Sequence, residues 1–472
     1  MKRFGEGTSA ANNFRPAMSE LRTVATEIVS ELQRAGFGAF WVGGCVRDFL
    51  LGREPKDYDI VTSALPDQVE KLFERTIAVG RKFGVMVVLK GEFQFQVATF
   101  RAEGDYRDGR HPERVVFGDA MADANRRDFT VNGLFYDPIL DKLHDWVGGE
   151  ADLRAKIIRT IGAPSERFAE DHLRLLRAVR FAAQLEFQIE PGTFQAVKAS
   201  AARIREISAE RVRDELIKLF QAPHASRGLE LLRESNLLAQ VIPELAATIA
   251  CQQSPDYHPE GSVFNHLVLM LKHLPEGADP SLPWAVLLHD IAKPVTASTD
   301  PQTGSIHFYG HERIGAEMAQ EILGRLRFPH KQMEEIITAV QCHMQFKDAL
   351  QMRKSTLRRM LMRPTFPLEL DLHRLDCLGS HGQLDVYDFL VEQARELEKV
   401  PEIRPPLLKG EDLIALGMQP GPEMGAVLAE VREKQLQDEL KSQADALAWV
   451  KERLGDKGGN AFGRKEGRDQ KD

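Results

Sequence analysis

The sequence predicts an α+β fold, in which a sheet-containing N-terminal part precedes a long helical part. Residues 39–42 and 85–89 are short apolar runs typical of strands, and residues 93–97 alternate apolar and polar side chains as a half-buried strand does. From about residue 146 the apolar residues follow helical spacing instead. The length of 472 residues is enough for three or four domains.

Composition and charge exclude several classes of protein. The hydrophobic share of 43% is sufficient for packed cores. No apolar run reaches the roughly 18 residues of a membrane span, and the N-terminus lacks the apolar stretch of a signal peptide. The four cysteines have no C-x-x-C spacing, which favours reduced thiols in a cytoplasmic protein. Because the net charge is −8, contact with a nucleic acid requires local basic patches.

The first elements lead to a double glycine. Residues 1–18 are polar and rich in small residues, which predicts a flexible N-terminus. A helix is expected from about Ser19 to Ala35. Its apolar face is formed by Leu21, Val24, Ile28 and Leu32. The strand at 39–42 then runs into Gly43 and Gly44.

The run W-V-G-G-C-V-R-D-F-L-L-G-R-E-P-K-D-Y-D-I at residues 41–60 carries the strongest chemical signal. If Asp57 and Asp59 lie in a strand, their side chains share one face, and each raises the cost of ionising the other. A divalent cation relieves that conflict, and carboxylate oxygens suit Mg²⁺. The glycines allow close approach to a triphosphate. The run predicts a site for metal-assisted nucleotidyl transfer, the alternative being a glycine turn and two surface aspartates.

Two charged segments follow. Residues 102–122 form either a solvated loop or a mobile loop at the mouth of a nucleotide site. Arg126, Arg127 and Asp128 precede the apolar start of a possible helix, so a capped helix would explain them. Guanidinium groups also suit phosphate oxygens, so these three residues are candidates to hold a ribose and phosphates beside the metal.

Asp171 and Arg174 are three residues apart and are expected to share a helix face. They could form a surface ion pair of small energy. They could instead present an acceptor and a donor to the edge of a nucleobase, which would allow protein side chains to select a nucleotide without a template strand. The residue types leave both interpretations open. Ser208 is the expected N-cap of a further helix.

Five motifs occur in a fixed order: G-G-C-V-R-D, D-Y-D, R-R-D-F-T-V-N-G, E-D-H-L-R and E-R-V-R-D-E-L. In this order they resemble class II tRNA nucleotidyltransferases (CCA-adding enzymes) and bacterial poly(A) polymerases, of the polymerase-β-like nucleotidyltransferase superfamily. The resemblance is dense over about residues 25–235. It implies a head domain with a small mixed sheet, followed by an all-α neck, a helical HD domain and a helical tail.

The resemblance also implies roles for individual residues. Asp57 and Asp59 would bind catalytic Mg²⁺, with Gly43, Gly44 and Arg47 on the triphosphate. Arg126, Arg127 and Asp128 would hold the ribose and phosphates, Asp171 and Arg174 would recognise the base, and Glu210 and Arg211 would brace the neck helices. One departure is Gln96, where relatives commonly have a glutamate, so a third carboxylate is not expected there.

A second set of metal-binding residue types begins after residue 250. Its members are His266, His289, Asp290, His307, His311, His343, His373 and Asp376. So many polar groups on apolar helices need partners if they are buried, which favours a shared metal. Imidazole and carboxylate together suit transition metals as well as Mg²⁺.

This segment resembles an HD-domain metal-dependent phosphohydrolase. The resemblance implies that His266, His289, Asp290 and Asp376 are the core ligands of a divalent metal, with His311 and His343 as candidates for a second metal or for phosphate. It further implies phosphatase or 2′,3′-cyclic phosphodiesterase activity on damaged RNA ends. A metal kept for structure, or an HD fold without turnover, is the alternative.

These observations predict a division of the chain. The segments are a flexible N-terminus (1–18), head (19–145), neck (146–240), HD domain (241–400), helical tail (401–454) and disordered C-terminus (455–472). The expected function is addition of CCA to the 3′ end of tRNA from CTP and ATP by two metals, without a membrane or an obligate protein partner. The mixed charges of residues 464–472 favour tRNA over poly(A) synthesis mildly, since related poly(A) polymerases often carry a long basic tail.

Three alternatives stay open. Within the same fold, the enzyme would be a poly(A) polymerase or would add only the terminal A. In another class, the chain would be a metal-dependent phosphohydrolase whose N-terminal half only binds RNA, which the presence of both Asp57 and Asp59 speaks against. A non-catalytic RNA-binding scaffold is the third, and the full set of polar motif residues disfavours it.

Overall fold

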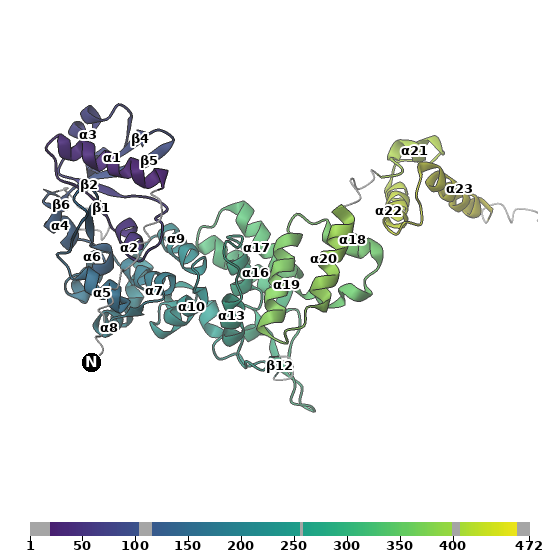
Figure 1. Ribbon diagram of the computed structural model, residues 1–472. Helices are drawn as coiled ribbons and strands as arrows, with labels where there is room; N and C mark the ends of the chain where they lie inside the picture. The colour runs from purple at the N-terminus through teal and green to yellow at the C-terminus, as the bar shows by residue number, and fades with distance from the viewer. Residues whose placement is uncertain (1–18, 103–115, 255–257, 399–405, 460–472) are drawn as a thin grey trace, which may run out of the picture. The chain divides into compact units, whose positions relative to one another are not determined.

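The computed structural model describes residues 19–102, 116–254, 258–398 and 406–459. The chain divides into two compact units, Met1–Pro243 and Glu244–Asp472 (Figure 1). No helix among the described residues is both long and apolar enough to cross a membrane. The finer division into six segments stays a prediction.

Unit 1 contains a seven-stranded sheet in the order β3-β4-β5-β2-β1-β8-β9. Its strands are β1 (Ala39–Val42), β2 (Ile60–Thr62), β3 (Thr76–Gly80), β4 (Val85–Lys90), β5 (Phe93–Thr99), β8 (Phe135–Asp137) and β9 (Lys142–His144). Strands β2 and β5 are parallel, with Ile60 opposite Val97, and the other neighbours are antiparallel. The sheet is therefore mixed, as the resemblance implied.

The predicted helix and strands that build this sheet are confirmed. Helix α1 (Glu20–Arg34) begins after Ser19, whose hydroxyl accepts from the amide of Arg22, and it packs against β1, β2 and β5 (Figure 1). Complete burial of Ile28 and Leu32, at about 2 kcal/mol for each side chain, fixes its apolar face on the sheet. In β5, the apolar side chains are buried or half-buried and the two glutamine side chains between them are exposed, as their alternation predicted.

Two local predictions in the head need correction. Asp57 and Asp59 lie in the segment before β2, which begins only at Ile60, so they are not in a strand. The amide of Val42 nevertheless donates to the carbonyl of Asp59 at 3.0 Å, which extends the pairing of β1 with this segment. The predicted loop 102–122 includes the end of β6 (Arg101–Ala102), β7 (Val116–Phe117) and the start of α4 (Ala120–Asn125), while 103–115 lies outside the described residues.

The rest of unit 1 is mainly helical. Its helices are α2 (Gly44–Leu50), α3 (Pro66–Leu72), α5 (Gly149–Ala155), α6 (Pro164–Glu170), α7 (Arg174–Leu185), α8 (Pro191–Ser200), α9 (Ala209–Phe220), α10 (Ala225–Glu234), α11 (Leu238–Val241) and the short η1 (Arg81–Phe83), η2 (Thr130–Asn132) and η3 (Ala201–Glu206). A short parallel pair, β10 (Ile157–Ile158) with β11 (Gln188–Ile189), interrupts the expected all-α neck. Ser208 is the N-cap residue of α9, but its side chain makes no capping hydrogen bond.

Unit 2 is helical apart from the hairpin β12 (Ala297–Thr299) and β13 (Ile306–Phe308). Its helices are α13 (Val263–Lys272), α14 (Leu282–Leu288), α15 (Lys293–Thr296), α16 (His311–Arg325), α17 (His330–Cys342), η4 (His343–Gln351), α18 (Lys354–Leu361), α19 (Phe366–Gly379) and α20 (Asp385–Glu398), after α12 (Pro243–Ala247) at the division. Helices α21 (Gly410–Ala415), α22 (Pro422–Leu436) and α23 (Gln443–Gly459) share a separate core. Helix α23 continues past residue 455, where the disordered C-terminus was expected to begin.

Candidate nucleotide and metal sites

An open cavity of about 680 Å³ lies in unit 1 beside the glycine turn that follows β1. Every head and neck residue that was predicted to bind the nucleotide or its metal lines it. These residues are Gly43, Gly44, Arg47, Asp57, Asp59, Arg126, Arg127, Asp128, Asp171 and Arg174. The fold thus brings together four segments that are far apart in the sequence.

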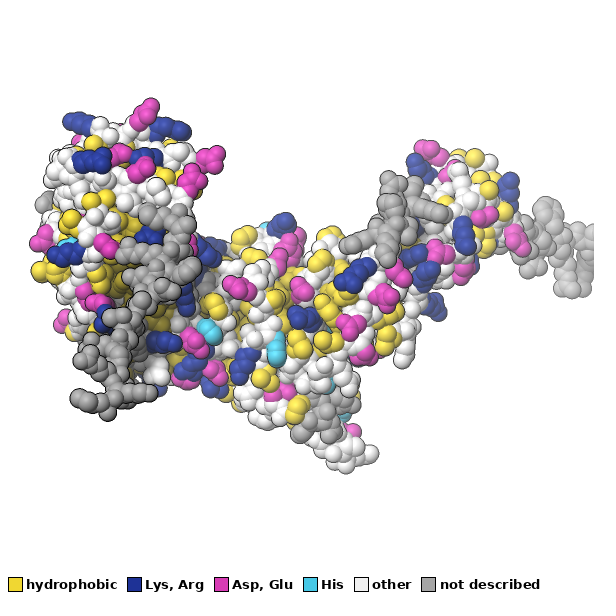
Figure 2. Space-filling model, viewed as in Figure 1, with side chains coloured by type: hydrophobic (Ala, Val, Ile, Leu, Met, Phe, Trp, Pro, Cys, Tyr) yellow, Lys and Arg dark blue, Asp and Glu magenta, His cyan; other side chains and the backbone are white. Residues whose placement is uncertain are grey.

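Basic side chains outnumber carboxylates in this cavity. Its wall also contains Arg101, Arg177, Arg180, Arg211 and Lys218, whereas its carboxylates are Asp57, Asp59, Asp128 and Asp171. Elsewhere, side chains of both signs are interspersed over the face shown in Figure 2. The cavity is therefore a local basic site of the kind that the negative net charge of the chain requires for binding phosphates.

The electrostatics of Asp57 and Asp59 fit a divalent cation. Burial raises the pKa of the Asp59 carboxyl, the charge of Asp57 raises it further, and Arg127 only partly opposes both effects. A bound divalent cation would remove this repulsion, because it attracts both carboxylates. The two residues therefore have the charge and the ligand type that Mg²⁺ requires.

Glycine is needed at position 43 for two reasons. Its φ is +75°, in the left-handed region, and a Cβ atom there would lie 3.2 Å from Nη1 of Arg127. The positive φ strains any other residue, and a Cβ atom would additionally require this guanidinium to move by a few tenths of an ångström. The turn after β1 and the Arg126–Arg127 segment consequently form adjoining parts of the cavity wall.

Asp123 orients both arginines, and the sequence analysis missed it. Its fully buried carboxylate pairs with Nη2 of Arg126 at 2.7 Å and with Nη2 of Arg127 at 2.9 Å. Burial raises the pKa of Asp123, but the two guanidinium groups outweigh burial and lower it. The sequence spacing could have indicated these pairs, because Asp123 on α4 lies three and four residues before the two arginines that directly follow this helix.

Asp128 lines the cavity, but its carboxylate is occupied by internal donors. Oδ1 accepts from the amide of Phe129 at 2.8 Å and from Nδ2 of Asn132 at 3.1 Å. Oδ2 accepts from Nε of Arg177 at 2.8 Å and from its Nη2 at 2.6 Å. Burial alone would raise the pKa of Asp128, but Arg177 and these hydrogen bonds lower it to about 2. Its carboxylate thus joins the head to helix α7.

Asp171 and Arg174 are not on one helix, and the predicted shared face is wrong. Helix α6 ends at Glu170, and α7 begins at Arg174, so Asp171 lies in the connection. The two side chains do not form an ion pair with each other. Oδ2 of Asp171 accepts from Nη2 of Arg211 at 2.6 Å, and Arg174 pairs with Glu170. Both side chains still line the cavity.

The neck helices α7 and α9 are joined by buried charge pairs. Nε of Arg180 donates to Glu215 Oε2 at 2.6 Å, and Arg177 lies 3.6 Å from the other oxygen of this carboxylate. Arg211, expected as a brace, contacts Asp171 from α9, whereas Glu210 is exposed. In the head, Gln96 lines the cavity at the position where relatives commonly have a glutamate. It precedes Val97, which lies opposite Ile60 in the pairing of β5 with β2.

Unit 2 brings six of the predicted histidines and aspartates together as two groups of potential metal ligands. These groups, together called the HD cluster, are His266, His289 and Asp376, and Asp290, His311 and His343. A third group among the described residues is His258, Glu260 and His266, of which only His266 was predicted. Nε2 of His266 lies 3.0 Å from Asp376, and Nε2 of His289 lies 3.1 Å from Asp290. His307 and His373 line the adjoining cavity of about 670 Å³ but belong to none of these groups.

The backbone fixes the orientation of three of these imidazoles. Nδ1 of His289, His311 and His343 each lies within hydrogen-bond distance of the carbonyl three residues earlier, at 2.9, 2.7 and 2.6 Å. With Nδ1 as the donor, each Nε2 presents its lone pair to the carboxylates. Nε2 of His266 and of His289 is buried and makes no hydrogen bond among the described residues. These nitrogens and carboxylates fit a bound cation.

The carboxylates of the cluster are held in their charged form. Burial would raise the pKa of Asp290 and Asp376, but His289 and Lys293 beside the first, and His266 beside the second, hold both pKa values well below the usual range. Lys293 was not predicted as a site residue. Its Nζ lies 2.7 Å from Asp290 Oδ2, and the side chain is largely buried.

Comparisons with known proteins match three segments of the chain. Residues 39–159 match the family described as "Poly A polymerase head domain", residues 186–249 match "Probable RNA and SrmB- binding site of polymerase A", and residues 256–378 match "HD domain". The CCA-adding enzyme of Geobacillus sp. (strain WCH70) is 45% identical over 221 residues, which is 47% of this chain and 54% of that enzyme. The CCA-adding enzyme of Lactobacillus helveticus (strain DPC 4571) is 38% identical over 52% of this chain and 63% of that enzyme.

A solved structure is similar over nearly the whole chain. The CCA-adding enzyme of Bacillus stearothermophilus in complex with CTP matches with a TM-score of 0.73 and 26% identity, over 94% of this chain and 100% of that one. The chain thus contains a poly(A) polymerase head domain and an HD domain, and it is similar to CCA-adding enzymes in sequence and in fold. A CCA-adding enzyme of Thermotoga maritima, complexed with tRNA, shares the fold with a TM-score of 0.56 and 20% identity, over 93% of this chain and 96% of that one.

The matched segments follow one another as head, RNA-binding segment and HD domain. The head match contains Asp57, Asp59 and the Arg126–Asp128 segment, and the HD match contains all three groups of potential metal ligands. Both kinds of domain depend on metals. The alignments with the two curated relatives cover only about half to two thirds of their length.

Proposed function

We propose that this protein is a template-independent RNA nucleotidyltransferase that adds C, C and A to the 3′ end of tRNA from CTP and ATP. The observation that carries this proposal is the convergence, in one cavity, of a carboxylate pair, a set of arginines and the Asp171–Arg174 segment. The first two suit a metal triphosphate, and the third suits the edge of a base. The CTP complex of the Bacillus stearothermophilus enzyme supports the same choice of substrate.

The residues of the cavity divide the reaction among them. Asp57 and Asp59 would hold two Mg²⁺ ions, which would supply charge stabilisation for the attacking and leaving oxygens. The 3′-hydroxyl of the RNA attacks the α-phosphate, the bond to the β-phosphate breaks, and pyrophosphate leaves. Arg47, Arg126 and Arg127 offset the charge of the phosphates. Gln96 cannot accept the proton that the attacking 3′-hydroxyl loses. A carboxylate of the segment before β2, Asp57 or Asp59, would accept it instead.

Nucleotide choice is assigned to Asp171 and Arg174, in an arrangement that differs from the predicted one. Arg211 holds one carboxylate oxygen of Asp171, and the amide of Leu173 donates to the other at 3.0 Å. Glu170 and the carbonyl of Arg167 hold the guanidinium of Arg174. Because both groups are oriented before a base arrives, reading the base costs less side-chain entropy.

Primer extension with Mg²⁺ tests the proposed function. The RNAs are tRNAs ending at the discriminator base, at C and at CC, with an unstructured RNA as the control, and CTP and ATP are offered separately and together. We expect stepwise addition of C, C and A that then stops. Addition of A to the CC end alone would make the protein an A-adding enzyme, and long A tracts on any RNA would make it a poly(A) polymerase.

We also propose that the HD cluster is a phosphohydrolase site that acts on RNA ends. It would bind a divalent metal, and its imidazoles favour a transition-metal ion. Nε2 of His289 makes no hydrogen bond with the described residues, and His289 lines an open cavity together with Asp290 and Asp376, which supports a catalytic rather than a closed structural site.

The Asp290→Asn variant tests this second function. With Ni²⁺, Mn²⁺ or Mg²⁺, wild-type protein is expected to hydrolyse a 2′,3′-cyclic nucleotide or a phosphomonoester, and the variant is expected to lose at least about 10²-fold of this rate. Nucleotide incorporation by the head serves as the control and should be retained. Wild-type protein that binds the metal without hydrolysing either substrate would reduce the cluster to a structural role.

A further inference from the structure

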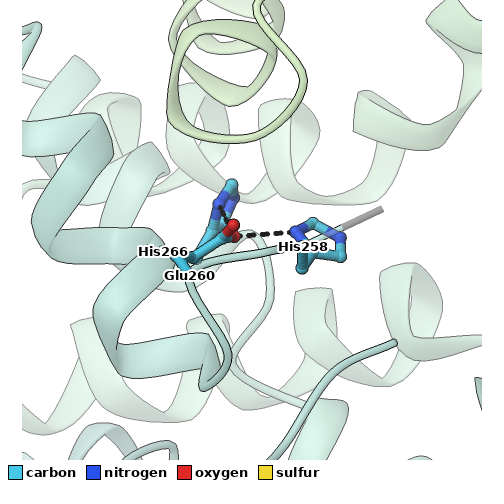
Figure 3. Close-up of side chains that lie close together, drawn as sticks. All are labelled: His258, Glu260 and His266. Carbon is cyan, nitrogen blue, oxygen red and sulfur yellow. Dashed lines mark hydrogen bonds and ion pairs between the residues drawn. The ribbon is translucent and has the colours of Figure 1, made fainter. Parts of the chain in front are cut away.

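Glu260 is a buried carboxylate beside the HD cluster that the sequence analysis did not single out. Its Oε1 lies 2.9 Å from Nδ1 of His258 and 2.9 Å from Nδ1 of His266, so it lies between the two imidazoles (Figure 3). Its side chain is only 6% exposed. Oε2 makes no hydrogen bond with the described residues. Burial of such a charge is costly, which calls for a compensating role.

His266 differs from the other histidines of the cluster in the partner of Nδ1. His289, His311 and His343 each use a backbone carbonyl three residues earlier. Nδ1 of His266 is within hydrogen-bond distance of the carbonyl of Gly379 at 3.4 Å, and it also has a closer ion-pair contact with the carboxylate of Glu260 at 2.9 Å. A carboxylate in this position makes the opposite nitrogen a stronger metal ligand, because negative charge increases the basicity of the ring.

We propose that Glu260 is a positioning residue of the HD metal site, acting through His266. Its negative charge beside Nδ1 favours the tautomer that carries the proton on Nδ1, so the lone pair of Nε2 faces Asp376, whose Oδ1 is 3.0 Å away. This proposal rests on the metal site proposed above. It adds the residue that sets the affinity of that site.

The same carboxylate orients His258. The rings of His258 and His266 meet edge to face with centroids 5.0 Å apart, and His258 lines the cavity beside the cluster. Because Nδ1 of His258 faces Glu260, Nε2 is the nitrogen left for the cavity. His258 therefore separates two explanations. If Glu260 acts through His266, His258 is not a ligand, whereas a metal held directly by His258, Glu260 and His266 would need it.

The test measures metal affinity in full-length protein. To remove the head site from the measurement, Asp57 and Asp59 are both replaced by asparagine, and Ni²⁺ is titrated calorimetrically into the metal-free protein. Glu260→Gln, which keeps the shape of the side chain, is expected to weaken binding by about 10- to 100-fold. The visible absorption spectrum of bound Co²⁺ is expected to shift, because the ring of His266 changes its basicity and orientation.

Two further variants serve as controls. Glu312→Gln removes a carboxylate 3.8 Å from Nδ1 of His311, which already has the carbonyl of Phe308 as acceptor, so affinity and spectrum should stay unchanged. His258→Ala should also leave the affinity within about twofold of the parent. With Asp57 and Asp59 intact, nucleotide incorporation should be the same for Glu260→Gln and wild type.

Several outcomes would overturn the proposal. Unchanged affinity and spectrum in Glu260→Gln would show that Glu260 does not act on the metal. Equal losses in His258→Ala and Glu260→Gln would place the ion directly among His258, Glu260 and His266. No Ni²⁺ binding by the parent protein would remove the HD metal site itself, and with it this inference.

Discussion

Replacement of Asp59 by asparagine is expected to lower nucleotide incorporation by about 10³-fold or more, while HD metal binding is retained. The reason is that the reaction needs the carboxylate pair of Asp57 and Asp59 to hold the metal, which contributes several kcal/mol to transition-state stabilisation. Incorporation is measured as single-turnover primer extension with saturating CTP. Retained incorporation would contradict the two-metal assignment.

A stability measurement separates loss of the metal site from misfolding in the Asp59→Asn variant. Because burial and Asp57 raise the pKa of Asp59, its ionised form costs stability in the metal-free protein at neutral pH. The metal-free variant should therefore unfold no more easily than wild type at pH 7, and any difference should vanish below the usual pKa of an aspartate. Asp67→Asn, an exposed change in α3, is the matched control and should leave incorporation unchanged.

Replacement of Arg177 by methionine is expected to destabilise the junction of head and neck by about 3 kcal/mol. It leaves the buried carboxylate of Asp128 with only the amide of Phe129 and the side chain of Asn132 as partners. The free energy of local opening is measured by hydrogen exchange of the amides in η2 and α7. Arg227→Met in α10, which removes an exposed pair with Glu234, is the control and should cost at most about 1 kcal/mol.

The pH dependence of the Arg177→Met effect has a defined sign. With a pKa of about 2 in the folded protein, Asp128 contributes stability above its ordinary pKa and loses it as the pH falls from about 4 to 2. The difference between wild type and variant should therefore shrink over this range. Adding Asp128→Asn to Arg177→Met should recover part of the loss, since no unpaired charge remains. A constant difference with pH would mean that Arg177 stabilises by packing alone.

Local sequence patterns were sufficient for the elements of the head. The spacing of Ile28 and Leu32 marks the buried face of α1, and the alternation in β5 marks its exposed glutamines, because both patterns follow from backbone geometry within one element. The five motifs likewise contain all the residues that were predicted to bind the nucleotide or its metal, and all of these line the cavity, although Arg101, Arg177, Arg180 and Lys218 of its wall lie outside the motifs. The HD motifs contain the members of two groups of potential metal ligands, but Glu260 of the third group was not predicted.

Only the tertiary structure decided how these side chains are held. Asp171 appeared to belong with Arg174, yet a break between α6 and α7 separates them, and Arg211 from α9 is the partner of Asp171. Short-range spacing cannot show such a pair, because it depends on how two helices pack.

Short-range spacing could not show the contacts of Arg177 and Glu260 either. Arg177 holds Asp128, 49 residues earlier in the chain, and Glu260 lies between two imidazoles whose orientation follows from the fold. The sequence alone determined which chemical groups the protein has and in which elements most of them lie. The packing of distant segments determined which group holds which, since burial makes each unpaired charge too costly to leave alone.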